Sequence, residues 1–213
     1  MTVLFPPSSN RVPALLGALV LLGGVLAVFV VWFWFSPRHT DVGYQPIQPV
    51  PYSHKLHAGL MGMDCRYCHQ NVEDGPHATI PDANTCMNCH TRVLPESEFL
   101  KPVRDAHKDT NAPVRWLKVH LLPDFAYFNH AAHVSAGVGC ASCHGRIDQM
   151  EIVRQAEPLS MSWCLECHRA PAQHLRPADK ITDMAFVPNP EEGRRIMAEK
   201  KLNPPIHCSG CHR

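Results

Sequence analysis

Every cysteine of this 213-residue chain falls within one of five short units that share the pattern Cys-x-x-Cys-His. Numbered one to five along the chain, these motifs are Cys65–His69, Cys86–His90, Cys140–His144, Cys164–His168 and Cys208–His212. Histidine fills 15 of the 213 positions. A histidine after all five cysteine pairs therefore has chance odds on the order of one in a million. The pattern indicates one repeated chemical function for all of the cysteines.

The spacing within each motif is that of covalent haem attachment. Two thiols three residues apart can form thioether bonds to the two vinyl groups of one porphyrin, and the histidine that follows is then placed beneath the iron. The predicted thioether cysteines are Cys65, Cys68, Cys86, Cys89, Cys140, Cys143, Cys164, Cys167, Cys208 and Cys211. The predicted proximal iron ligands are His69, His90, His144, His168 and His212.

Two other uses of cysteine fit this pattern less well. Disulfide bonding would leave the five histidines unexplained, and a zinc ribbon needs no histidine after every second cysteine. The sequence therefore predicts five covalently bound haem c groups, numbered here as their motifs are.

The sixth coordination position of each iron separates an electron carrier from an enzyme. An open iron can bind a small molecule, whereas a doubly ligated iron only changes valence. Among the ten other histidines, His54 and His57 precede motif one, and His130 and His133 precede motif three, each pair within the pattern aromatic-x-His-x-x-His. At positions i and i+3 of a helix the two imidazoles diverge by about 60°, so one pair can serve two haems.

These histidine pairs resemble segments of small multihaem cytochromes of the cytochrome c3 type. The resemblance implies that His54 ligates haem one and His130 haem three, while His57 and His133 ligate neighbouring haems. As the fifth distal ligand we predict His120, which lies in an apolar-rich stretch close to the second pair. The alternatives are His77, His107, His207 and Met161.

An apolar run without a charged residue occupies residues 13–35 and is about 34 Å long as a helix. A cleavable signal peptide would have a shorter apolar region followed by small residues. This run instead ends in Trp32-Phe33-Trp34-Phe35, which is typical of an interfacial aromatic belt. We therefore predict a transmembrane anchor at 13–35 after a cytoplasmic N-terminus at 1–12. Because haem is attached outside the cytoplasm, the haem domain should lie on the periplasmic side of the cytoplasmic membrane.

The rest of the chain should contain little regular structure, because most of it is committed to wrapping cofactors. Prolines at 37, 46, 49 and 51 predict an extended linker over 36–51, and the pentahaem domain follows over 52–213. A capping Asn189, a first-turn Pro190 and favourable charges at both ends predict a helix over 190–202. The expected fold is mainly α with low regular secondary structure: a single N-terminal transmembrane helix and a multihaem cytochrome c domain wrapped around five haems.

Four stretches together resemble the pentahaem, membrane-anchored subunit of alternative complex III. They are PYSHKLHAGLMGMDCRYCH, HATIPDANTCMNCH, WLKVHLLPDFAYFNHAAHVSAGVGCASCHG and MSWCLECHR, which lie within roughly residues 44–170. The resemblance implies a quinol-oxidising respiratory or photosynthetic complex. Its other subunits are an iron–sulfur subunit resembling molybdopterin oxidoreductases, polysulfide-reductase-like integral membrane subunits and a monohaem cytochrome. This chain would pass electrons through its haems to a soluble acceptor or an oxidase, with no catalytic site of its own.

Net charge and motif type bear on the other functions that this chain could have. Lys and Arg number 20 and Asp and Glu 19, a net charge of +1, so no broad field favours nucleic acid as a partner. A single-anchor quinol dehydrogenase of the tetrahaem type, whose haem domain itself meets quinol, fits one anchor and a linker too. A multihaem enzyme would need one open iron and usually an altered motif, whereas all five motifs here end in histidine.

Overall fold

The computed structural model describes residues 5–109 and 111–212. The first four residues of the expected N-terminal segment, and Arg213 at the end of the expected haem domain, lie outside the described residues. The chain divides into two units, Met1–Asp41 and Val42–Arg213. Each is described here by itself.

The N-terminal unit consists of one long apolar helix with short flanking turns. A 3-10 turn at Pro7–Arg11 leads into α1 (Val12–Trp34), and α2 (Pro37–Thr40) follows. Leu and Ala side chains favour the helix, and its best window has a mean hydropathy of 2.8. The helix begins and ends one residue before the predicted span. None of its side chains is buried within the chain, so its apolar surface depends on an environment that the chain itself does not provide.

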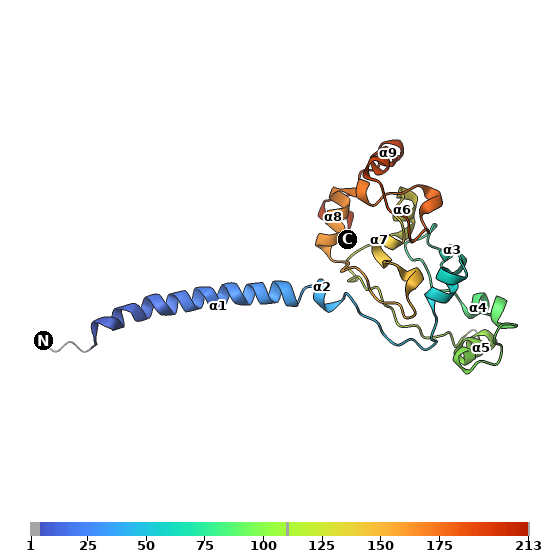
Figure 1. The fold of residues 1–213 in the computed structure, drawn as a ribbon, viewed down its shortest axis with the longest axis horizontal. Coiled ribbons are helices and arrows are strands. Elements are labelled where there is room, and N and C mark those ends of the chain that lie inside the picture. The colour runs from blue at the N-terminus through green and yellow to red at the C-terminus, as the bar shows by residue number, and fades with distance from the viewer. Residues whose placement is uncertain (1–4, 110, 213) are drawn as a thin grey trace. The chain divides into compact units, whose positions relative to one another are not determined.

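The second unit is a chain of short helices joined by irregular segments (Figure 1). Its α-helices are α3 (Cys65–Cys68), α4 (Ala83–His90), α5 (Lys101–Lys108), α6 (His130–Ala136), α7 (Ala141–His144), α8 (Met161–Arg169) and α9 (Pro190–Lys200). A π-helical turn spans Lys55–Leu60. Among the described residues β-structure is limited to two isolated bridges, Ala126 with His212 and Val138 with Leu175. The predicted fold class, mainly helical with sparse regular structure, is confirmed.

The protein core of this unit is thin. The buried apolar side chains in the described part are Val50, Met87, Val103, Ala106, Val119, Met150, Leu175, Ile181, Met184 and Ile196. Only Val50, Met87 and Val103 form a contiguous cluster, which lies where α4 packs against α5. A domain of this size ordinarily buries much more apolar surface. Bound cofactors would supply the missing apolar mass.

Residues 42–51 belong to the folded unit, although the sequence predicted a linker as far as residue 51. The backbone of Gly43 donates to the carbonyl of Gln155 at 2.8 Å. The side-chain amide of Gln48 donates to the Leu117 carbonyl at 2.8 Å and accepts from the Leu117 N–H at 2.9 Å. Prolines keep this segment extended, and its polar groups pair with strand-like segments far along the chain. The boundary between the units therefore falls at Asp41.

Helix α9 confirms the prediction of a late helix and ends two residues earlier than expected. The Asn189 side chain accepts a hydrogen bond from the backbone of Glu191, and Lys201 ends the helix in a left-handed conformation. Gly193 lies directly against the turn at Pro171–Gln173, where any Cβ would overlap the carbonyl of Ala172. A glycine is therefore required at this close approach.

Replacement of Gly193 by alanine should destabilise the second unit. Alanine normally favours a helix by about 1 kcal/mol, but overpacking against backbone costs about 1–3 kcal/mol, and the neighbouring carbonyl cannot rotate away. Thermal unfolding of the full chain should show a lower midpoint than the parent. The matched control is Gly23→Ala in α1, which meets nothing within 4 Å. An unchanged midpoint for Gly193→Ala would show that α9 does not dock at this turn.

Candidate haem-binding sites

Each of the five motifs lies on a helical turn that gathers its reactive side chains. Motifs one to four lie on α3, α4, α7 and α8, and motif five lies on a 3-10 turn at Cys208–Gly210. The turn places the two cysteines on one side because residues i and i+3 of a helix are neighbours. Asp64, Asp82 and Ser160 cap three of these helices through hydrogen bonds to backbone N–H groups. No disulfide joins any of the ten cysteines, which all lie among the described residues.

Four of the five proximal histidines share one hydrogen-bonding arrangement. In each, the Nδ1 atom lies within hydrogen-bonding distance of a backbone carbonyl: His69 with Thr79 at 2.7 Å, His90 with Val93 at 2.9 Å, His168 with Pro205 at 2.7 Å and His212 with Phe125 at 3.0 Å. A carbonyl only accepts, so Nδ1 carries the proton and Nε2 keeps its lone pair. That is the tautomer that an iron ligand needs, and metal-ligating histidines usually have such a partner.

His144 differs from the other proximal histidines. Its Nδ1 lies 3.3 Å from the Nε2 atom of His120, and the two rings meet edge to face with their centres 4.4 Å apart. The structure thus brings His120, predicted as the fifth distal ligand, to the side of a proximal histidine.

The two histidine pairs are held in matching ways by the aromatic residue that precedes each. Tyr52 stacks on His57, with ring centres 4.5 Å apart and 24° between planes, and meets His54 edge-on at 4.8 Å and 87°. Phe128 stacks on His133 at 4.4 Å and 29° and meets His130 edge-on at 4.7 Å and 89°. The aromatic ring therefore fixes both imidazoles of a pair in divergent directions. The sequence pattern predicted the histidine pairs, but it did not predict that the aromatic residue orients both imidazoles of a pair.

Three distal candidates lie opposite a proximal histidine. The ring centres are 6.2 Å apart for His57 and His90, 6.0 Å for His133 and His168, and 6.4 Å for His130 and His144. Metal–imidazole bonds are about 2 Å long, so two imidazoles on one metal have centres roughly 6 Å apart. In all three distal candidates Nδ1 lies beside a backbone carbonyl, which again leaves Nε2 for a metal: His57 with Ser53, His130 with Pro76 and His133 with Asn129.

His54 is half-buried near His69, and its Nδ1 atom is buried. Burial, with smaller contributions from His69 and His57, lowers the pKa of His54 to about 4. Its Nδ1 atom has no hydrogen-bond partner within the protein. A buried neutral imidazole with an unsatisfied nitrogen costs free energy unless another group approaches it.

The other candidates for a fifth distal ligand lie elsewhere. His212 contacts Phe125, with ring centres 5.7 Å apart. His107 lies beside the Asn84 side chain at 2.7 Å and His207 beside the Ser209 hydroxyl at 3.1 Å. Met161 is 66% exposed. These hydrogen bonds of His107 and His207, both among the described residues, do not join them to a proximal histidine.

A buried cation lies next to motif three. Arg176 is 2% exposed, its Nη1 donates to the Asp183 carbonyl at 2.9 Å, and its Nε has no partner within the protein. Its guanidinium packs on Gly139, which is the residue before Cys140. A Cβ atom at position 139 would overlap the guanidinium. A buried unsatisfied cation requires an anion or an acceptor. The carboxylates of a covalently attached haem would meet this requirement, so the residues around the motif fit such a group.

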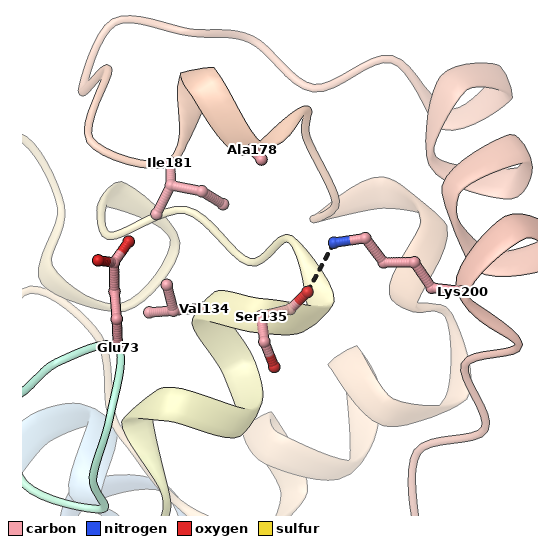
Figure 2. A pocket seen from close by; sticks show the side chains of 6 residues that line it. All are labelled: Glu73, Val134, Ser135, Ala178, Ile181 and Lys200. Carbon is pink, nitrogen blue, oxygen red and sulfur yellow. Dashed lines mark hydrogen bonds between the residues drawn. The ribbon is translucent and has the colours of Figure 1, made fainter.

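No group of three or more His, Cys, Asp or Glu side chains in the described part of the chain is gathered as a site for a bare metal ion. The structure does contain a hollow of about 190 Å³, lined by Glu73, Val134, Ser135, Ala178, Ile181 and Lys200 (Figure 2). Across it the Lys200 ammonium donates to the Ser135 carbonyl at 2.6 Å. None of these lining residues belongs to a motif. The bond ties the end of α9 to α6, which carries His133.

Comparison with known proteins finds a similarity in the C-terminal part of the chain. Residues 132–213 match the family model described as cytochrome c3. The match includes motifs three, four and five.

A curated relative extends this result to more of the chain. The chain is 34% identical over 132 residues to the multihaem cytochrome c subunit of menaquinone reductase from Nitratidesulfovibrio vulgaris strain Hildenborough. The aligned region is 60% of this chain and 59% of the relative, so the chain spans about three fifths of that protein. The chain is thus similar to cytochrome c3 in its C-terminal part and to the multihaem cytochrome c subunit of a menaquinone reductase over about three fifths of its length.

Proposed function

We propose that this chain is the electron-transfer subunit of a membrane-bound quinone or quinol oxidoreductase, and that it carries five covalently bound c-type haems. The resemblance to alternative complex III favours quinol oxidation, with electrons passing from quinol to a periplasmic acceptor. The observation that carries the proposal is the continuous line of attachment motifs through the folded unit. Figure 1 shows α4, α3, α7 and α8 following one another across the unit, and a side-chain contact of motif four with the segment before motif five supports the order two, one, three, four, five.

Side-chain contacts support the links at the start of this line. Motifs two and one meet where the Asn88 amide donates to the Tyr67 hydroxyl at 3.0 Å. Motifs one and three meet at Cys65 and Cys140, whose side chains lie within hydrogen-bonding reach of each other. The Thr182 hydroxyl also lies 3.3 Å from the Asp64 carboxylate, which joins motif one to the segment beside motif three.

The remaining links are equally direct. Phe128 joins the distal candidates for haems three and four. Burial, together with smaller contributions from the nearby thiols of Cys167 and Cys164 in motif four, raises the pKa of the Cys143 thiol to about 12. Motifs four and five meet where the His168 ring bonds to the Pro205 carbonyl at 2.7 Å, three residues before Cys208.

The proposed ligand sets follow from these positions. Each iron would be held by a proximal and a distal imidazole, in the pairs His69 with His54, His90 with His57, His144 with His130 and His168 with His133. His212 is the proximal ligand of haem five, whose distal ligand is left unassigned. When bound, the haems supply one-electron carriers whose iron changes valence without releasing its ligands. Except at His54, whose Nδ1 has no partner within the protein, a hydrogen-bond partner lies beside Nδ1 of each of these imidazoles and leaves Nε2 for the iron.

Helix α1 would hold this domain at the membrane. Its 23 residues are long enough to span the hydrocarbon core, and its closing aromatic residues suit the interface. Because covalent haem attachment occurs outside the cytoplasm, we propose that the haem domain faces the periplasm. The partners would be the iron–sulfur, integral membrane and monohaem cytochrome subunits that the resemblance implies, and a soluble electron acceptor.

The proposal is tested by purifying the full chain, tagged at its N-terminus, from native membranes in mild detergent. We expect it to co-purify with integral membrane and iron–sulfur subunits, and we expect quinol-dependent electron transfer from the assembly but not from the chain alone. Quinol oxidation by the isolated chain would instead establish the single-anchor dehydrogenase. A chain that binds no haem would reject both.

The name of the relative favours a second direction of electron flow. The related subunit belongs to a menaquinone reductase, so an assembly that reduces menaquinone with electrons from a periplasmic donor is the second candidate. Activity assays on the same purified assembly distinguish the two directions of electron flow. Menaquinone reduction by a reduced periplasmic cytochrome, without quinol oxidation by an oxidised one, would favour the second candidate.

A further inference from the structure

His120 distinguishes one haem site from the other four. Four proximal histidines have a backbone carbonyl beside Nδ1, whereas His144 has the imidazole of His120 there, with 3.3 Å between Nδ1 and Nε2. If His144 ligates iron through Nε2, His120 contacts the opposite nitrogen of the same ring. This inference rests on the proposed function, since it takes motif three as a haem attachment site.

The geometry does not allow His120 and His144 to share an iron. Their ring centres are 4.4 Å apart and their planes meet at 79°, whereas two imidazoles on one metal have centres roughly 6 Å apart. His130 provides that separation, since its ring centre lies 6.4 Å from that of His144 with only 10° between planes. Haem three therefore has its distal ligand in His130, and His120 is left for another role.

The segment that carries His120 is firmly held. The backbone of Leu117 makes two hydrogen bonds with the Gln48 side chain, at 2.8 and 2.9 Å, and Val119 is buried. Trp116 packs against the apolar cluster of Val50, Met87 and Val103. These contacts set the position of the His120 backbone, so its ring meets His144 without depending on a flexible loop.

We propose that His120 is a positioning residue for His144, which accepts the Nδ1–H hydrogen bond of that ligand through its own Nε2. The bond fixes the ring orientation and the tautomer of His144, as outer partners of ligating histidines do. An imidazole nitrogen is a stronger base than a carbonyl oxygen, so it draws the Nδ1 proton away and makes His144 a more electron-rich ligand. A richer ligand stabilises ferric iron, and haem three should have a lower reduction potential than a carbonyl partner would give it.

The test compares two substitutions at His120 in the full haem-loaded chain. His120→Phe removes the acceptor and keeps an aromatic ring, whereas His120→Gln keeps a side-chain acceptor of the carbonyl type. His107→Phe is the matched control, because His107 contacts only the Asn84 side chain in the hydrogen-bond network. The readouts are the number of low-spin haems by EPR and the individual potentials from an EPR-monitored redox titration.

We expect every variant to keep the parent number of low-spin haems. In His120→Phe one component of the titration should shift to higher potential, in His120→Gln the same component should shift less, and in His107→Phe none should shift. Loss of a low-spin haem in either His120 variant would show that His120 is an iron ligand and would overturn the proposal. Unshifted potentials in both would also overturn it. A parent protein without haem would instead reject the proposed function, so the two failures are distinguishable.

Discussion

Replacement of His133 by alanine should leave the haem attached at Cys164 and Cys167 with a single imidazole ligand. The His133 ring centre lies 6.0 Å from that of His168, and Phe128 fixes its orientation. Without it the sixth position of that iron is open, and an iron with one strong axial ligand becomes high-spin. Low-temperature EPR of the oxidised full chain should show one fewer low-spin haem than the parent and a new high-spin signal.

His57→Ala should have the same effect on the haem attached at Cys86 and Cys89, because the His57 and His90 rings lie 6.2 Å apart. The double variant should lose two low-spin haems, since the two histidines serve different irons. His107→Ala is the matched control and should lose none. If the single variants retained every low-spin signal, the pairing of distal and proximal histidines read from the structure would be wrong.

Removal of an internal haem should disrupt electron transfer within the chain far more than removal of a terminal one. In the proposed order two, one, three, four, five, motif one joins motif two to the rest, while motif five contacts motif four. Changing both cysteines of motif one to alanine should isolate haem two. Changing both cysteines of motif five should leave four connected haems. The rate of electron transfer falls steeply with separation, so the gap left by motif one should slow exchange across it.

Stopped-flow reduction of the full chain by a slow chemical reductant distinguishes these cases. The motif-five variant should be reduced in one phase, as the parent is, because its haems equilibrate faster than they are reduced. The motif-one variant should show two phases, one for a single haem and one for the other three. If that variant does not accumulate, the motif-three variant should show two phases of equal size. Single-phase reduction of the motif-one and motif-three variants would contradict the proposed order.

The haem-attachment residues could be predicted from the sequence because the side chains that attach one haem lie close together in the chain. Covalent haem attachment needs residues within one helical turn, so five consecutive positions carry the whole signal. The histidine pairs are equally local, and Tyr52 and Phe128 lie two residues before the first member of each pair. Helix α9 could be predicted for the same reason, since the cap at Asn189 and the first-turn Pro190 adjoin it.

What could not be predicted depends on contacts between distant segments. The carbonyls that fix the tautomers of His168 and His212 come from Pro205 and Phe125, 37 and 87 positions away. The contact of His120 with His144 likewise spans 24 positions, so it could not be predicted from the place of His120 near the second histidine pair. Prolines predicted an extended segment over 36–51, but not that Gln48 would pair with Leu117, 69 positions away.

The central claim is that this chain holds five redox-active haems, and a quantitative reductive titration of the purified full chain tests it most directly. The titration counts electrons taken up per chain while the visible absorption of the haem follows reduction. We predict five electrons per chain, one for each motif, all accompanied by the absorption changes of c-type haem. Uptake of electrons without haem absorption, or of clearly fewer than five with it, would contradict this account.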